Sequence, residues 1–285
     1  MVKEHLSTIP SRKEDTHKGD FGHVFVVAGS RGMTGAAYLA SQAALVSGSG
    51  LVTCGIPLSL NAVMEAKLTE VMTLSLPETK DASLASSGEK EIAEFAKKAG
   101  AVAIGPGLSG NADTQKLVKK LLKNINKPIV LDADGIMALV GNCDILKKRK
   151  APTILTPHPG EMSRLIGKDI SAIRRNREKT ALAFAKKYGV TLVLKGRGTV
   201  VATSKGDVYI NQTGNSGMST AGVGDVLTGM IASFVGQGIN PYSAAVIGVH
   251  LHGLAGDIAA REKGQFSMIA GDLLEKLPQA IQEVL

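Results

Sequence analysis

Short apolar runs alternate with amphipathic stretches along most of this 285-residue chain. Runs rich in Val, Ile and Leu are typical of buried strands, and they cover residues 23–28, 51–55, 101–105, 128–132, 153–156 and 192–195. Stretches with helical spacing lie between most of them, for example at 35–47, 90–98, 113–123 and 172–188. Strands and helices that alternate in this way predict a parallel sheet with helices on both faces.

The pattern changes in the last third of the chain. "LVLKGRGTVVATSKGDVYIN" indicates short strands joined by glycine turns, partly antiparallel at a sheet edge. From Val226 the spacing is helical almost to the end, with a second helix over 241–260. Because no repeat and no Pro- or Ser-rich linker interrupts the chain, we expect one domain over residues 1–285.

Composition limits the classes of partner. The net charge is +8, which favours polyanionic ligands. However, the lysines of one predicted helix have the spacing of a solvated face, and no aromatic residues lie between the basic ones to stack on bases. A small anion such as a nucleotide is therefore favoured over nucleic acid. These lysines are Lys116, Lys119, Lys120 and Lys123.

Three further features favour the cytoplasm. Cys54 and Cys143 form no C-x-x-C motif and lie in apolar contexts, as reduced cysteines do. The first 22 residues have no apolar segment of the kind found in signal peptides. No uninterrupted apolar run is long enough to span a bilayer, so we expect no membrane partner.

A glycine-rich loop precedes the helical pattern that starts at Val226. The segment "GNSGMSTAGVGD" holds four glycines and ends at Asp225. Glycines can turn several N–H groups toward one point, and a helix start adds unpaired N–H groups with partial positive charge. This predicts an anion site, most naturally for a phosphate, with a carboxylate at its mouth. Asp225 would then take a proton from a hydroxyl, or else it is simply the N-cap of the helix.

Other polar and glycine-rich motifs follow the predicted strands. Ligands of open α/β sheets bind at the carboxyl ends of strands, so these motifs are expected to meet. They are "GSRGMTGAA", "GPGL", "DADG", "TPHPGE" and "KGRGT", after the first, third, fourth, fifth and sixth predicted strands.

Two common nucleotide-binding motifs fit poorly. Gly29, Gly32 and Gly35 have the G-x-x-G-x-x-G spacing of short-chain dehydrogenases, but no tyrosine in the sequence has a lysine four residues later. A dehydrogenase is therefore the weaker interpretation. No P-loop occurs in the sequence, since pairs such as Gly167–Lys168 lack the following Ser or Thr. The loop before Val226 is left as the main phosphate site.

Two motifs have both a functional and a structural interpretation. Prolines flank His158, which places it in a turn, and Glu161 falls in the first turn of the next helix. Substrate contact by His158 is a better interpretation than a metal pair. In "LDADG", Asp132 and Asp134 are candidates for Mg²⁺ binding with nucleotide phosphates, and an N-cap role for Asp134 is an equal alternative. His250 and His252, two residues apart on a helix, cannot share a metal.

Taken together, these motifs resemble those of the nucleotide-dependent NAD(P)H-hydrate dehydratases of the ribokinase-like superfamily. "AIGPGL", "DADG", "LTPHPGEM", "VLKGRGTVV" and "NQTGNSGMSTAGVGDVLTGMIA" carry the resemblance, which covers nearly the whole chain. It implies a three-layer α/β/α fold. It also implies repair of the S epimer of hydrated NADH or NADPH (NADHX, NADPHX) with ADP or ATP as phosphoryl donor and Mg²⁺ as helper. The stand-alone form, often a homotetramer, is the expected one.

The resemblance also assigns roles to matching positions. Asp225 would be the base, and Gly222, Val223 and Gly224 would form the anion hole. The hydrate would contact Ala37, Gly107, His158 and Asp225. Val223 stands where relatives usually have Ser or Thr, which removes a hydroxyl but leaves the backbone donors. The adenine nucleotide would contact Gly224 and the loop Lys195, Gly196, Arg197, Gly198 and Thr199.

Two other functions remain open from the sequence. A small-molecule kinase of the ribokinase type would share the Gly-x-Gly-Asp ending, and a nucleotide-sensing protein without turnover would share the anion loop. The choice between ADP and ATP, and between NADHX and NADPHX, is left open.

Overall fold

The computed structural model describes residues 2–285. Its centre is a nine-stranded sheet in the order β3-β2-β1-β4-β5-β6-β7-β8-β9. Strands β1 to β7 run parallel, and β8 and β9 continue the sheet as antiparallel strands, as the sequence predicts. The strands are β1 (His23–Val27), β2 (Leu51–Pro57), β3 (Met72–Leu76), β4 (Ala101–Ile104), β5 (Ile129–Leu131), β6 (Thr153–Leu155), β7 (Thr191–Leu194), β8 (Val200–Ala202) and β9 (Val208–Ile210).

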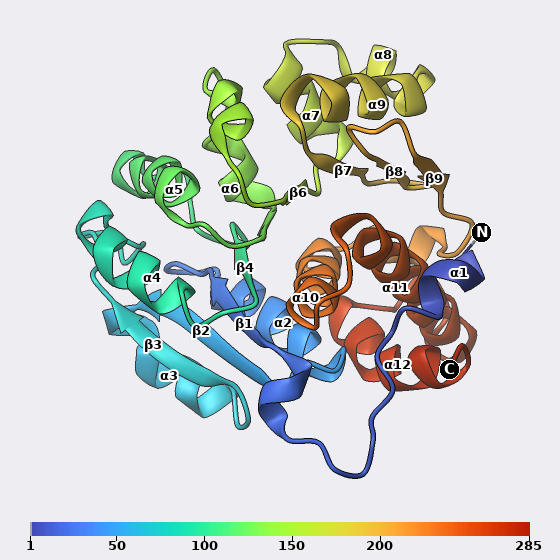
Figure 1. Ribbon diagram of the computed structural model, residues 1–285, viewed down its shortest axis with the longest axis horizontal. Coiled ribbons are helices and arrows are strands. Elements are labelled where there is room, and N and C mark those ends of the chain that lie inside the picture. Colours follow the sequence, from blue (N-terminus) through green and yellow to red (C-terminus); the bar gives the residue numbers. More distant parts are fainter. Residues whose placement is uncertain (1) are drawn as a thin grey trace.

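Helices cover both faces of the sheet and complete three layers (Figure 1). One layer contains α2 (Thr34–Val46), α3 (Asn61–Lys67), α10 (Val223–Gly236), α11 (Pro241–Lys263) and α12 (Ala270–Gln282), with α1 (Val2–Leu6) packed against α11. The opposite layer contains α4 (Glu89–Ala96), α5 (Ala112–Asn124), α6 (Ala133–Met137), α7 (Pro159–Ile166), α8 (Ile170–Arg175) and α9 (Arg177–Tyr188). Short 3₁₀ helices connect these elements at Lys18–Phe21, Leu58–Leu60, Ser86–Gly88, Cys143–Lys148 and Ser216–Met218.

The sheet separates two hydrophobic cores. Successive side chains of a strand point to opposite faces, so Val24 and Val26 of β1 pack under α2 and α10, whereas Phe25 and Val27 pack under the other layer. Both faces are fully buried at these positions, which explains why the parallel strands read as continuous apolar runs.

Two predictions about the elements are wrong. β3 was not expected, because most residues of "MTLSL" are only partly buried and Met72 is exposed at the sheet edge. The helix predicted over 172–188 is two helices, α8 and α9. They are separated at Asn176, whose φ of −130° and ψ of 44° are not helical.

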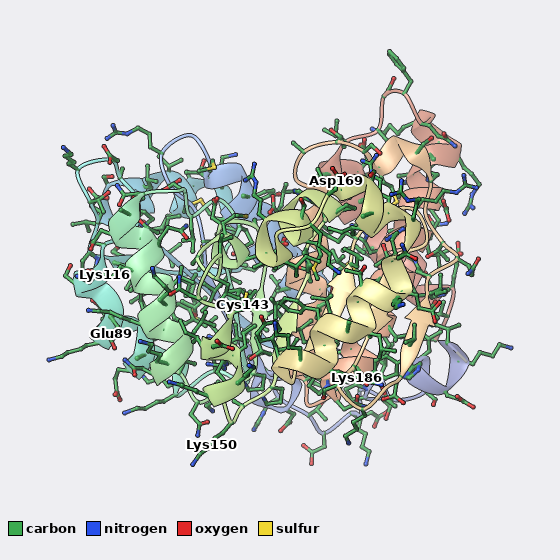
Figure 2. All side chains as sticks on the ribbon, turned by 90° about the horizontal axis from the view of Figure 1, so that it is seen from above. Glu89, Lys116, Cys143, Lys150, Asp169 and Lys186 are labelled. Atoms are coloured by element: carbon green, nitrogen blue, oxygen red, sulfur yellow. The ribbon has the colours of Figure 1, made fainter. Side chains whose placement is uncertain are left out.

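The basic face of α5 is confirmed as a solvated face. Lys116 and Lys123 are exposed, whereas Leu117, Leu121 and Leu122 of the same helix are buried. Figure 2 shows this side of the molecule, with Lys116 and Lys186 labelled.

Helix α11 is the central helix of its layer. By length and composition alone it could cross a membrane, but 78% of its most apolar window is buried inside the structure. It packs against α10 and α12, so its apolar character is that of a core helix.

The strand order reverses between β1 and β4. The loops that follow these strands meet there and bind each other: Gly29 N–H donates to Pro106 O at 2.8 Å, and Ser30 Oγ donates to Gly107 O at 2.8 Å. A reversal of this kind usually opens a crevice for a ligand. Here the joined loops occupy that position, and a large cavity lies farther along the sheet, beside β5, β6 and β7.

Candidate active site

A cavity of about 1170 Å³ opens beside the carboxyl ends of β5, β6 and β7. Its wall combines the motifs after these strands with the loop at 211–222 and the first turn of α10. All five strand-end motifs were expected to meet; three of them do so in this wall, whereas the two after β1 and β4 lie outside it. From the motifs after the strands the wall takes Asp132, Ala133, His158, Glu161, Lys195, Gly196, Arg197, Gly198 and Thr199.

The start of α10 presents unpaired backbone donors to this cavity. Gly222 is the N-cap, with φ of 87°, and a Cβ there would come within 2.5 Å of Leu39 Cδ1. No side chain caps the helix, and within residues 2–285 the N–H groups of Val223, Gly224 and Asp225 donate to no backbone carbonyl. Three free N–H groups at the positive end of a helix make a site for a phosphate or another anion.

Asp225 is the third residue of α10 and not its N-cap, so the simple capping alternative is wrong. Burial raises the pKa of its carboxyl to about 7, and the negative charge of Asp132 adds to the rise while Lys195 opposes it. A carboxyl with this pKa exchanges protons near neutral pH, which suits a general base.

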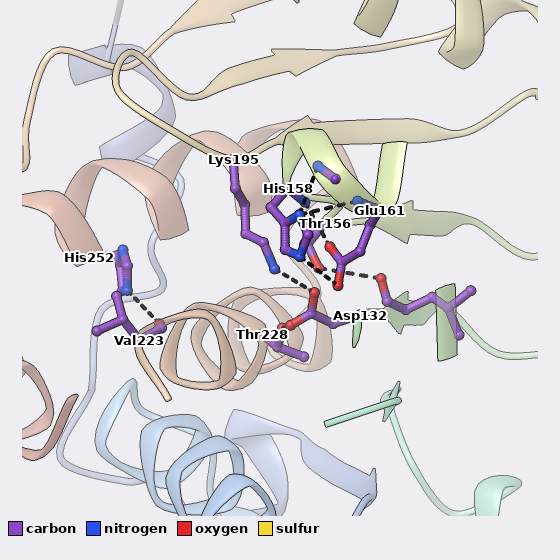
Figure 3. Close-up of polar contacts among 10 residues, drawn as sticks. Asp132, Thr156, His158, Glu161, Lys195, Val223, Thr228 and His252 are labelled. Carbon is purple, nitrogen blue, oxygen red and sulfur yellow. Dashed lines mark hydrogen bonds and ion pairs between the residues drawn. The ribbon is translucent and has the colours of Figure 1, made fainter. Parts of the chain in front are cut away.

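A buried ion pair lies next to Asp225. Lys195 Nζ is 2.7 Å from Asp132 Oδ1, and Thr228 Oγ1 donates to Asp132 Oδ2 at 2.7 Å (Figure 3). Asp132 is 1% exposed. A Cβ on Gly224 would lie 3.2 Å from Lys195 Nζ, so the ammonium group passes directly over the first turn of α10.

This network corrects the interpretation of "DADG". Asp132, and not Asp134, occupies the N-cap position of α6, and its side chain binds Lys195 and Thr228 in place of the helix N–H groups. Asp134 Oδ2 accepts the Ser109 N–H at 2.8 Å. Both oxygens of Asp132 are therefore engaged. No group of three or more His, Cys, Asp or Glu residues that could hold a metal occurs within residues 2–285.

His158 and Glu161 form a capping box at the start of α7. Nδ1 of His158 accepts the N–H groups of Gly160 and Glu161 at 2.9 and 3.1 Å, and Glu161 Oε2 accepts the His158 N–H at 2.7 Å. This confirms the predicted turn before the helix. The imidazole is more than half exposed and lies on the cavity wall. Its Nε2 makes only a 3.6 Å contact to Glu161 Oε1, which is too long for a hydrogen bond. Burial raises the pKa of Glu161, while Lys195 lowers it.

Arg177 binds the backbone of the loop after β7. Its guanidinium donates to Leu194 O at 2.7 Å and to Arg197 O. Within the loop, Thr199 Oγ1 donates to Gly196 O at 2.9 Å. These bonds fix a turn whose inner side lines the cavity.

Two predicted substrate contacts lie away from the cavity wall. Ala37 is 0% exposed and sits in the core beneath Gly29, and Gly107 is buried where the two joined loops meet. Neither residue lines the cavity.

Sequence patterns missed several polar residues of the site. Thr228 lies one turn after Asp225 among mostly apolar residues. A polar side chain at such a position was the one sign in the sequence that it has a role in the site. Asp257 of α11 accepts the Gly214 N–H at 2.9 Å and the Asn215 Nδ2 at 2.9 Å, and so holds the glycine loop. Asp257 lies 43 residues from Gly214, and no local pattern connects them.

The NAD(P)H-hydrate dehydratase family matches residues 24–279 of the chain. The chain belongs to this family. It is 46% identical over 278 residues to the bifunctional NAD(P)H-hydrate repair enzyme Nnr of Moorella thermoacetica, an alignment that covers 98% of this chain and 52% of the relative. The chain thus spans about half the length of that relative.

Solved structures support the same family and fold. The ADP/ATP-dependent NAD(P)H-hydrate dehydratase of Bacillus subtilis, co-crystallized with ATP/Mg²⁺, has a TM-score of 0.86 and 32% identity, covering 100% of this chain and 98% of that one. A ribokinase from Thermotoga maritima has a TM-score of 0.55 at 18% identity, covering 90% of this chain and 99% of that one. The ribokinase-like fold is therefore established, and family membership sets the dehydrogenase interpretation aside.

Proposed function

We propose that this chain dehydrates the S epimer of NADHX or NADPHX to NAD(P)H at the expense of ADP or ATP. The observation that carries the proposal is the placement of the Asp225 carboxyl, with its pKa of about 7, at three unpaired N–H groups of a helix start inside the cavity. A site that can bind the transferred phosphoryl group and a base are thus adjacent. The family gives the substrate class.

The adenine nucleotide would bind along the loop of residues 195–199 and end at Gly224. All of these residues line the cavity, and Lys195 brings a positive charge over the first turn of α10. Arg197 adds a second cationic group on the same wall. The terminal phosphate of ADP or ATP would then lie at Gly222, Val223 and Gly224, where helix N–H groups stabilise negative charge.

The chemistry would proceed by phosphorylation and elimination. Asp225 takes the proton of the ring hydroxyl, whose oxygen attacks the terminal phosphorus, and AMP or ADP leaves with the electrons of the broken P–O bond. The phosphate then leaves the ring with the C–O electrons, the neighbouring carbon loses a proton, and the ring double bond returns. Such transfers depend mainly on positioning and charge stabilisation, which backbone donors supply here without a hydroxyl at position 223.

Mg²⁺ would enter with the nucleotide. Asp132 is already engaged by Lys195 and Thr228, and residues 2–285 hold no cluster of metal ligands. This fits the way Mg²⁺ binds, through phosphate oxygens and waters with few protein ligands. When bound, the ion would neutralise phosphate charge.

The hydrate would approach from the side of His158, which shares the cavity with Asp225. Nδ1 of His158 is committed to the cap of α7, so Nε2 would face the substrate. Ala37 and Gly107 lie outside this wall, at the joined loops after β1 and β4, and stay proposed contacts of the hydrate on the family resemblance alone.

We also propose a cytoplasmic homotetramer that binds neither nucleic acid nor membrane. Both cysteines are free and buried, as is usual in a reducing compartment. The tetramer is proposed from the family resemblance alone.

An assay with (S)-NADHX, Mg²⁺ and either ADP or ATP tests the function. Recovery of the NADH absorbance band with formation of AMP or ADP is the expected result. Phosphoryl transfer to an alcohol such as a thiazole, with none to NADHX, would make the protein a kinase. Nucleotide binding without turnover would make it a sensor.

A further inference from the structure

His252 contacts the backbone of the anion site. It lies on α11, is 7% exposed, and places Nε2 2.8 Å from the carbonyl oxygen of Val223, the first residue of α10 (Figure 3). Its ring also forms part of the cavity wall. The side chain thus connects a core helix to the turn that would hold the transferred phosphoryl group.

The protonation of His252 follows from its partner. A carbonyl oxygen only accepts, so Nε2 must carry a proton, and in a neutral ring Nδ1 is then the unprotonated nitrogen. Burial lowers the pKa of His252 to about 4, and the charge of Lys195 adds to this, while the bond to Val223 opposes it. The ring is therefore neutral and a constant donor at physiological pH.

The bonded carbonyl shares a peptide unit with a donor of the anion site. The Val223 C=O and the Gly224 N–H belong to one planar trans peptide, in which they point in opposite directions. Fixing the carbonyl therefore fixes the direction of the Gly224 N–H. Without a Cβ, Gly224 has no side chain of its own to hold that plane.

We propose that His252 is a positioning residue that holds the 223–224 peptide and thereby aims the Gly224 N–H at the phosphoryl group. The bond also polarises the peptide, which strengthens its N–H as a donor. This inference rests on the proposed function, because it assumes that Gly222 to Gly224 receive an anion. If His252 only satisfied its own polar atom in the core, its replacement would change the stability of the protein but not its phosphate binding.

The test compares His252→Leu, which cannot donate, with His252→Gln, whose Nε2 amide can. His250→Leu is the matched control, since His250 lies on the same helix, outside the cavity wall. The probe is inorganic phosphate added with AMP, followed by the amide signal of Gly224 in protein labelled with ¹⁵N-glycine. This readout does not require turnover of a hydrate, so it stays informative if the proposed substrate is wrong.

We expect wild type, His250→Leu and His252→Gln to show the same phosphate-dependent shift of the Gly224 signal. In His252→Leu the shift should shrink and phosphate affinity should fall about tenfold, with kcat falling about 10- to 100-fold at a little-changed KM for ADP, somewhat less than loss of a whole oxyanion donor. Equal phosphate affinity and equal Gly224 shifts in all four proteins would overturn the proposal. So would ring ¹⁵N signals of the wild type that show the proton on Nδ1, a result that needs no variant to fold.

Discussion

Lys195 Nζ lies 2.7 Å from Asp132 Oδ1, and this ion pair joins the loop after β7 to the end of β5. Buried pairs of this kind are stable only when further hydrogen bonds satisfy both partners, and Thr228 supplies one to Asp132. The two charges act on Asp225 in opposite directions: Asp132 raises its pKa and Lys195 lowers it. The proton affinity of Asp225 is thus set by burial together with this pair.

The pH dependence of catalysis should show the raised pKa of Asp225 directly. Asp225 accepts a proton only when ionised, and its pKa is raised to about 7. We therefore expect kcat/KM to fall about tenfold per pH unit below pH 7. ADP binding measured over the same range serves as the control. An acidic limb near the ordinary carboxyl pKa would contradict the assignment.

Stability should depend on Asp225 in the opposite sense to an ordinary salt-bridged carboxylate. Its folded pKa of about 7 exceeds the ordinary aspartate pKa of 3.8, so the unfolded chain loses the proton first and this group weakens folding as pH rises between these values. Asp225→Asn should match wild type below pH 4 and become more stable by up to about 4 kcal/mol above pH 7. Denaturant titrations at both pH values measure this. An equal free energy of unfolding at pH 8 would show that the carboxyl is not desolvated.

Two substitutions can distinguish the proposed contact of His158 with the hydrate from its capping role. His158→Ala removes both the ring and the acceptor for the N–H groups of α7, whereas His158→Asn keeps a good N-cap acceptor. Both variants should raise KM for the hydrate and leave ADP binding unchanged, and only the alanine should lose about 0.5–2 kcal/mol of stability. Normal hydrate binding in His158→Asn would limit His158 to its cap.

Arg177 should affect nucleotide binding without touching the nucleotide. Its bonds to the carbonyls of Leu194 and Arg197 hold the loop at 195–199. Arg177→Met should raise KM for ADP by about 10-fold, corresponding to a lost charged hydrogen bond, with a smaller change for the hydrate. Arg175→Met, at an exposed position in the preceding helix, is the control. Equal effects on both substrates would point to a general loss of folding.

The sequence predicted the parts of the fold that local patterns control. Buried parallel strands gave apolar runs, and the loops after them held the cavity residues. β3 was missed because an edge strand is only partly buried and leaves a weak pattern. The N-cap alternative for α6 was placed two residues too late, at Asp134, because Asp132 and Asp134 have the same local propensity and only the distant Lys195 distinguishes them.

The missed site residues have partners far away in the sequence. Thr228 and Asp132 are 96 residues apart, and His252 and Val223 are 29 apart. Both Thr228 and His252 lie in helices that read as apolar core. Their roles follow from the packing of α10, α11 and the sheet against one another, and the hydrophobic periodicity of the sequence does not predict this packing.

The central claim is that Asp225 activates the ring hydroxyl beside the anion site. Turnover of (S)-NADHX by Asp225→Asn, measured together with ADP binding by calorimetry, tests it most directly. We predict that kcat falls about 10²–10⁴-fold while ADP affinity is largely kept. A near-normal rate in Asp225→Asn, with ADP still bound, would contradict the claim.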